Sequence, residues 1–272
     1  MNDHVVKATF LRNALLHQSR VTEALFVPSD FTRPSHQFIL DTVSERYGEP
    51  SFCFFYGSHA FGRGDADSDI DVIVVMNNLA HAYSERFSSN GFLFDALVHD
   101  PETLHAMMRA EHNHGFAVLT AKVDQSLVLP QPCEVASKLK EVARGLLSSG
   151  PPREEKWDLP RRYLTAVLSD IERCADRDER RMMAMDLYIR MIDIFLRWHG
   201  QFSSRGRYLV RAVKRFDAAF FDRAQTAMVA LVQDDSLSPL LQLAREVLES
   251  IGGTLDRGYR EDYPGKLRSP LG

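Results

Sequence analysis

Residues 56–75 constrain the fold of this chain more than any other stretch, because a glycine-rich polar turn there separates two segments with strand character. Residues 52–56 form a short apolar and aromatic run that ends at Gly57, which is typical of a buried strand. Residues 69–75 are rich in valine and isoleucine and predict a second strand. We therefore expect strand, turn and strand to form one supersecondary unit.

The residue types in the turn suit a phosphate group. Gly57 lets the backbone turn and approach a ligand with no side chain in the way. Residues 58–61 are predicted to begin a short helix, whose free N–H groups and positive dipole end attract anions. Ser58 adds a hydroxyl that can donate to a phosphate oxygen. Gly57 and Ser58 are therefore predicted to bind phosphates.

Three aspartates accompany this turn. Asp69 and Asp71 are two residues apart in the second strand, so their side chains share a face. Asp95 lies inside the apolar run 92–99, where an unpaired carboxylate would be costly, so we expect a cation or strong hydrogen-bond donors beside it. Magnesium prefers carboxylate and phosphate oxygens, and two metals can stabilise both oxygens of a displacement at phosphorus. The three aspartates are therefore predicted as catalytic residues and as ligands of two Mg²⁺ ions.

With Gly57-Ser58, the run Ser68-Asp69-Ile70-Asp71 and Asp95, the chain resembles the DNA polymerase β-like nucleotidyltransferase superfamily over about residues 37–129. Its size and helical second half are similar to those of the kanamycin- and streptomycin-modifying members. This resemblance implies an α/β (α+β) nucleotidyltransferase domain with a small mixed sheet, followed by an all-α helical bundle that closes over the acceptor.

The implied reaction moves a nucleoside monophosphate from a nucleoside triphosphate to a hydroxyl of a small, aminoglycoside-like acceptor. ATP is the expected donor because relatives commonly use it. The attacking hydroxyl must lose a proton, for which Asp95 is the first candidate and Glu154 and Glu155 are weaker ones.

A basic stretch, residues 203–215, runs from a loop into a predicted helix. Its simplest interpretation is a solvated helix face. The alternative is that Arg205, Arg207 or Lys214 reaches the triphosphate, where fixed positive charge would stabilise the departing pyrophosphate.

Composition indicates a cytoplasmic globular enzyme, with 44% hydrophobic and 26% charged residues. No apolar run approaches the roughly 20 residues that cross a bilayer, and no basic, then apolar leader is present, so no membrane association is expected. A net charge of −4 argues against nucleic acid as a partner. Cys53, Cys133 and Cys174 lack CxxC spacing, which argues against a disulfide framework or a zinc site.

The run Ser-Ser-Gly-Pro-Pro at residues 148–152 marks a break in composition, so we predict domains at 1–150 and 151–272. In the first domain we predict strands at 52–56, 69–75, 92–99 and 126–129, and helices at 5–20, 35–47, 79–88, 101–113 and 133–147. In the second domain helical periodicity predicts an up-and-down bundle and then a loosely held tail from residue 252; the predicted helices are 156–175, 179–199, 207–232 and 239–251.

Two alternatives stay open on the sequence alone. The acceptor can be a protein or an RNA, as in toxin–antitoxin systems, or the chain can be a non-catalytic nucleotide-binding regulator. Presence of all three aspartates argues against the regulator. The helices of the second half can also pair between subunits. The resemblance to the kanamycin-modifying members, which complete their sites across a dimer, implies a homodimer as one arrangement of this chain.

Overall fold

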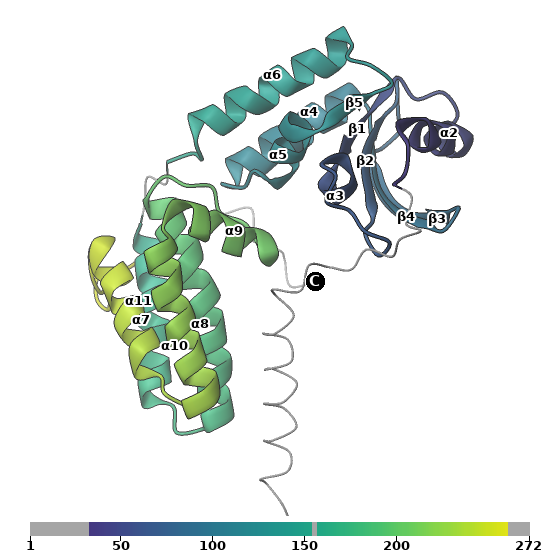
Figure 1. The fold of residues 1–272 in the computed structure, drawn as a ribbon. Coiled ribbons are helices and arrows are strands. Elements are labelled where there is room, and N and C mark those ends of the chain that lie inside the picture. The colour runs from purple at the N-terminus through teal and green to yellow at the C-terminus, as the bar shows by residue number, and fades with distance from the viewer. Residues whose placement is uncertain (1–32, 154–156, 261–272) are drawn as a thin grey trace, which may run out of the picture. The chain divides into compact units, whose positions relative to one another are not determined.

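The computed structural model describes residues 33–153 and 157–260, and these form two compact units (Figure 1). The first unit contains residues 33–100 and 126–132, and the second contains residues 101–125 and the described residues from 133 onward. The helices predicted at 101–113 and 133–147, which the sequence placed in the first domain, thus belong to the second unit. The domain boundary at residue 150 stays a prediction. The predicted helix 5–20 lies outside the described residues, as do Glu154 and Glu155.

A five-stranded sheet forms the body of the first unit, in the order β3-β4-β2-β1-β5. The strands are β1 (Phe52–Tyr56), β2 (Ile70–Val75), β3 (Tyr83–Ser89), β4 (Phe92–His99) and β5 (Leu127–Leu129). Strands β2 and β4 are parallel, whereas the β1–β2, β1–β5 and β3–β4 pairs are antiparallel. The predicted small mixed sheet is therefore confirmed.

Helix α2 (His36–Tyr47) packs on one face of this sheet (Figure 1). The Ser35 hydroxyl oxygen caps the helix by accepting from the Phe38 backbone N–H at 3.0 Å, which satisfies a donor that the first turn leaves free. Ile39 and Val43 of α2 are fully buried in one cluster with side chains of four strands, including Val72 of β2. The alternation of strand side chains sends every second residue into this core.

Residues 79–88 were predicted to be a crossover helix, and this prediction is wrong. Residues Tyr83–Ser89 are the edge strand β3, which pairs with β4 through the two-residue turn Asn90-Gly91. Both turn residues have positive φ, +47° and +83°, as a type I′ hairpin turn requires. The Asn-Gly signal and the alternation of β3 outweigh the weak helical pattern, because Phe87 packs toward α2 and stacks on Phe94 at 4.9 Å.

Helices α4 (Pro101–Asn113) and α6 (Glu134–Ser149) agree with the predicted elements, and α3 (Gly57–Ala60) is a single turn. Helix α5 (Val118–Gln125) was not predicted. Its first turn is capped from α4 by Glu111, whose carboxylate accepts from the backbone N–H groups of residues 118, 119 and 120 at 2.7–3.0 Å. This capping carboxylate lies seven residues or more before the helix that it caps, so no local pattern indicated it.

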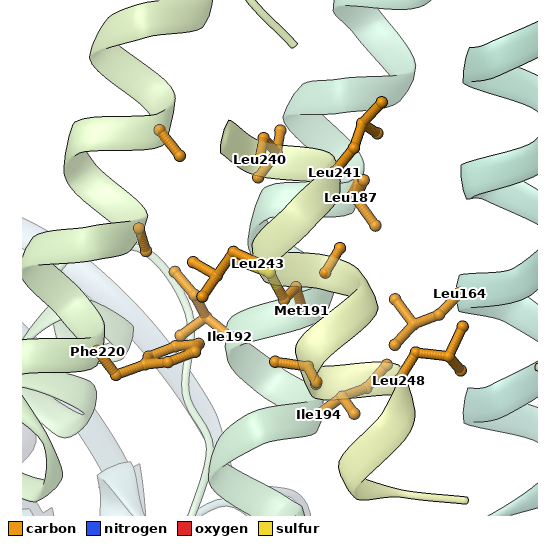
Figure 2. Close-up of a cluster of buried hydrophobic side chains, with 14 of the residues drawn as sticks. Leu164, Leu187, Met191, Ile192, Ile194, Phe220, Leu240, Leu241, Leu243 and Leu248 are labelled. Atoms are coloured by element: carbon orange, nitrogen blue, oxygen red, sulfur yellow. The ribbon is translucent and has the colours of Figure 1, made fainter. Parts of the chain in front are cut away.

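The remaining helices form the predicted bundle, which is confirmed. They are α7 (Asp158–Arg173), α8 (Arg177–Trp198), α9 (Arg207–Phe216), α10 (Ala218–Asp234) and α11 (Ser238–Ser250). Leu164, Leu187 and Met191 are fully buried among leucines and aromatic residues of the other helices (Figure 2).

Two details of the bundle differ from the sequence prediction. The predicted helix 207–232 breaks at Asp217, whose side chain caps α10 by accepting from the Phe220 N–H at 2.8 Å. The start of the expected loose tail is held by α7, because Leu255 N–H donates to the Thr165 hydroxyl at 3.0 Å. Among the helices in the described ranges, none has both the length and the apolar character that a membrane crossing needs.

Candidate active site

Two of the three predicted carboxylates lie side by side on the sheet. Asp71 of β2 and Asp95 of β4 are Cα partners in the parallel ladder, and partners in register point to the same face. Neighbouring strands are about 4.8 Å apart, so both carboxylates can reach one ligand. Along the same face of β2 the next inward residues, Ile73 and Val75, are fully buried. The acidic pair therefore lies where the apolar part of this face ends, and both side chains are half-buried.

Arg86 continues this row, because it is the Cα partner of Asp95 in the antiparallel β3–β4 ladder. Its guanidinium forms an ion pair with the carboxylate of Asp69, the residue immediately before β2. The third predicted ligand is thus on the same face, and it is bound by an arginine that the sequence analysis missed. The Asn90-Gly91 turn was the available signal, since a two-residue hairpin there places Arg86 opposite Asp95.

The glycine of the turn is required by its contact with the acidic pair. Gly57 has φ +80°, and a Cβ added there would lie 2.8 Å from Asp71 Cγ. No other residue type fits both the backbone angle and this close approach. Ser58 follows as the second residue of α3. Because α3 has only four residues, its dipole is small, so the predicted phosphate binding would have to rely on backbone N–H groups and the Ser58 hydroxyl.

The loop before Asp69 is held by its own side chains. Asp65 Oδ1 accepts from the Ser68 hydroxyl at 2.6 Å, and the Asp65 N–H donates to Ser68 Oγ at 3.0 Å. The bond from Ser68 lowers the pKa of the Asp65 carboxyl. Beneath this loop His59 is buried, its Nε2 is 3.0 Å from the Ser68 carbonyl oxygen, and Gly64 leaves room for its ring. These contacts fix the chain path between the turn and Asp69.

The chemistry of the donor set fits magnesium, and one of the three predicted ligands is turned toward an arginine. Asp71 and Asp95 provide hard oxygen ligands on adjacent strands, and Gly57 contributes no bulk beside them. Asp69, however, is turned to Arg86. Over residues 33–153 and 157–260, no three His, Cys, Asp or Glu side chains are arranged to hold a metal ion. Asp69 would therefore have to exchange the arginine for the metal.

The predicted cationic residues lie in the second unit, each above an aromatic ring. The Arg205 guanidinium is 5.7 Å from the Phe116 ring, and Lys214 Nζ is 4.7 Å from that of Phe221. Arg207 begins α9 and lies 5.2 Å from the ring of Tyr208. All three are exposed, which agrees with a solvated helix face, and their role at the triphosphate stays a prediction.

Two of the cysteines have positions typical of structural residues, one buried in a strand and one at the start of a helix. Cys53 is buried in β1, and burial raises the pKa of its thiol to about 12, so it is not a ready nucleophile. Cys133 caps α6, with the Ala136 N–H donating to its Sγ at 3.5 Å. All three cysteines are free thiols in this structure.

Comparison with known proteins gives similarity to solved structures alone, and this similarity is distant. No family model matches the chain, and no curated protein matches it. Among solved structures, a nucleotidyltransferase-like protein from Exiguobacterium sibiricum is similar over 79% of this chain and 73% of its own, with 12% identity and a TM-score of 0.45. A similarity this distant says nothing of the reaction, so the assignments below depend on the residues of the sheet and the turn.

Proposed function

We propose that this chain is a Mg²⁺-dependent nucleotidyltransferase. It would move a nucleoside monophosphate, AMP in the expected case, from a nucleoside triphosphate to a hydroxyl of a small acceptor resembling an aminoglycoside. One observation carries the proposal: Asp71 and Asp95 are paired in register where the Gly57-Ser58 turn packs against Asp71. A phosphate on the turn would thereby lie beside two carboxylates.

Each residue of the face has a separate task. Asp71, Asp95 and, once released, Asp69 would hold magnesium, which offsets the charge of the triphosphate when bound. Gly57 lets the turn pack directly against the Asp71 carboxylate, so a phosphate bound by the backbone N–H groups of the turn and by the Ser58 hydroxyl would lie beside that carboxylate. Fixed donors of this kind stabilise charge that develops in the transition state without reorganising.

The acceptor hydroxyl oxygen attacks the α-phosphorus, and the bond from that phosphorus to the pyrophosphate oxygen breaks. The hydroxyl proton passes to Asp95, whose half-buried carboxylate lies in the row of the site. Arg205, Arg207 and Lys214 are the candidates that would stabilise the leaving pyrophosphate. Positioning of the two reactants supplies much of the acceleration.

One alternative has an observation in its favour. The Asp69–Arg86 ion pair occupies a carboxylate that the reaction needs, and a nucleotide-binding regulator would tolerate this permanently. A nucleotidyltransferase that modifies a protein or an RNA differs from the main proposal only in its acceptor, so the same assay distinguishes both alternatives.

The test is magnesium-dependent release of pyrophosphate from each of the four nucleoside triphosphates. Acceptors are a panel of aminoglycosides and lincosamides, followed by protein and RNA extracts. The blank is the Asp69→Asn, Asp71→Asn double variant, and the matched control is Asp41→Asn on the exposed side of α2. Release that requires one acceptor and disappears only in the blank supports the proposal. Nucleotide binding without release on any acceptor contradicts it and favours the regulator.

A further inference from the structure

We propose that Arg86 exchanges partners when nucleotide binds. In the free protein it holds Asp69, and with nucleotide present it moves to a phosphate and releases Asp69 to the metal. The inference rests on the proposed function and deepens it, because it makes Arg86 a phosphate-binding residue and couples metal binding to nucleotide binding at the same site.

The position of Arg86 is the first support. It is the ladder partner of Asp95, which in turn is the ladder partner of Asp71, so one guanidinium and two carboxylates form a continuous row. The same guanidinium also reaches Asp69. Arg86 is therefore placed to respond to any change of charge among the three acids.

The charges on this face make the exchange necessary. In the absence of a metal, Arg86 offsets one of three negative charges that would otherwise repel one another. A divalent cation bound by the same carboxylates is a like charge for the guanidinium and competes with it for Asp69. A metal that binds without nucleotide must therefore break the Arg86–Asp69 ion pair, and Arg86 then has no other anion to bind.

The nucleotide provides that anion. Its phosphates, held by Gly57 and Ser58, would lie next to Asp71 on the face that carries Arg86. A guanidinium can form two parallel N–H bonds with a phosphate as it can with a carboxylate, so the nucleotide offers Arg86 a partner of the same kind as Asp69. Departure from Asp69 is easy, because the Arg86 side chain is 57% exposed and exposed ion pairs contribute little stability.

Metal and nucleotide should therefore strengthen each other's binding, and by thermodynamic linkage the effect is reciprocal. Without Arg86, Asp69 is available to the metal from the start. The metal alone should then bind more tightly, the nucleotide should bind more weakly, and the coupling between them should fall.

The adjacent residue on β3 provides a matched control. Glu85 is the partner of Ala96 on the opposite face of the sheet, and it forms an ion pair with Arg46 of α2 at 2.6 Å. Arg46→Ala therefore removes an arginine, and with it an ion pair made by strand β3. It leaves unchanged the face of the sheet that carries Asp71, Asp95 and Arg86.

The experiment measures Mn²⁺ binding to the full chain by electron paramagnetic resonance, alone and with the α,β-methylene analogues of ATP and GTP. In the wild type, analogue should tighten Mn²⁺ binding by about tenfold or more, within the usual range of coupling. Arg86→Ala should bind Mn²⁺ alone more tightly than wild type, bind analogue more weakly, and show coupling below about twofold. Arg86→Lys should keep part of the coupling, and Arg46→Ala should behave as wild type.

Two results overturn the inference in different ways. If Mn²⁺ and analogue bind with coupling that Asp71→Asn abolishes, but Arg86→Ala leaves both affinities within about twofold of wild type, the exchange is wrong and the proposed function stands. If the wild type binds neither Mn²⁺ nor analogue, the proposed function fails and the inference fails with it. Circular dichroism of each variant verifies that it is folded.

Discussion

Asp71 and Asp95 are brought into register by an edge hairpin, not by their spacing along the chain. The chain leaves β2, runs along the edge strand β3, and returns through Asn90-Gly91 as β4, which lies between β3 and β2. This path makes β4 parallel to β2 and places the two carboxylates side by side. It also places Arg86 on the other side of Asp95.

The paired carboxylates should be equally important for activity. Asp71→Asn and Asp95→Asn keep the side-chain shape but remove the charge that binds a cation, so each should lower kcat/KM by about 10²–10³-fold, as loss of a preorganised electrostatic contact does. The measurement is pyrophosphate release at saturating acceptor. Asp41→Asn is the control, and a loss of less than about threefold in either site variant would contradict the assignment.

Gly57→Ala should impair both stability and activity. Its φ of +80° costs a residue with a Cβ about 1–2 kcal/mol, and the added methyl also collides with the Asp71 carboxylate. Gly48→Ala separates the two effects, because Gly48 has φ +82° with nothing within 4 Å of an added Cβ. Chemical denaturation should show a loss of stability in both variants, whereas metal binding should be lost only in Gly57→Ala.

Acidification should weaken the fold through His99. Burial lowers the pKa of this imidazole below its usual value, so the unfolded chain binds the proton more readily than the folded chain. The stability contributed by the neutral ring is present above about pH 6.5 and is lost as the pH falls through the lower folded pKa. The free energy of unfolding, measured between pH 7.5 and pH 5.5, should fall less in His99→Gln than in the wild type. The exposed His81→Gln variant is the control.

The bundle core should be sensitive to truncation at Met191. This side chain is fully buried among leucines (Figure 2), so Met191→Ala should lower the free energy of unfolding by about 2–5 kcal/mol. Met182 lies on the same helix but is 70% exposed, so Met182→Ala should change the free energy by less than about 0.5 kcal/mol. Urea denaturation of both variants gives the comparison. Equal effects would mean that the packing of α8 differs from the one described.

Most of the helices and strands were predictable from local sequence patterns, because the residues that determine each of them lie within a few positions of one another. The β1 run ending at Gly57 and the valine-rich β2 carry their strand character in their own composition. Ser35 marked the start of α2 in the same way. The positions of the candidate-site residues on these elements, Gly57 and Asp71, were predictable for that reason, and their role in a reaction stays a prediction.

Features that depend on tertiary pairing were missed. The edge strand β3 is only partly buried, so its helical pattern and its strand pattern differ little, and the Asn-Gly turn decides between them. Arg86 could not be assigned to the site until β3 was placed beside β4. The ion pair of Asp69 joins residues 17 positions apart, and no spacing rule predicts it.

The most direct measurement of the central claim follows the phosphorus atoms. Nucleoside triphosphate labelled at either the α- or the γ-phosphorus is incubated with magnesium, the acceptor found in the panel, and wild-type or Asp71→Asn protein. We predict that α-label appears on the acceptor and γ-label only in pyrophosphate, and that neither product forms with the variant. Transfer of γ-label to the acceptor would make the chain a phosphotransferase, and α-label transfer that persists in Asp71→Asn would remove the paired carboxylates from the reaction.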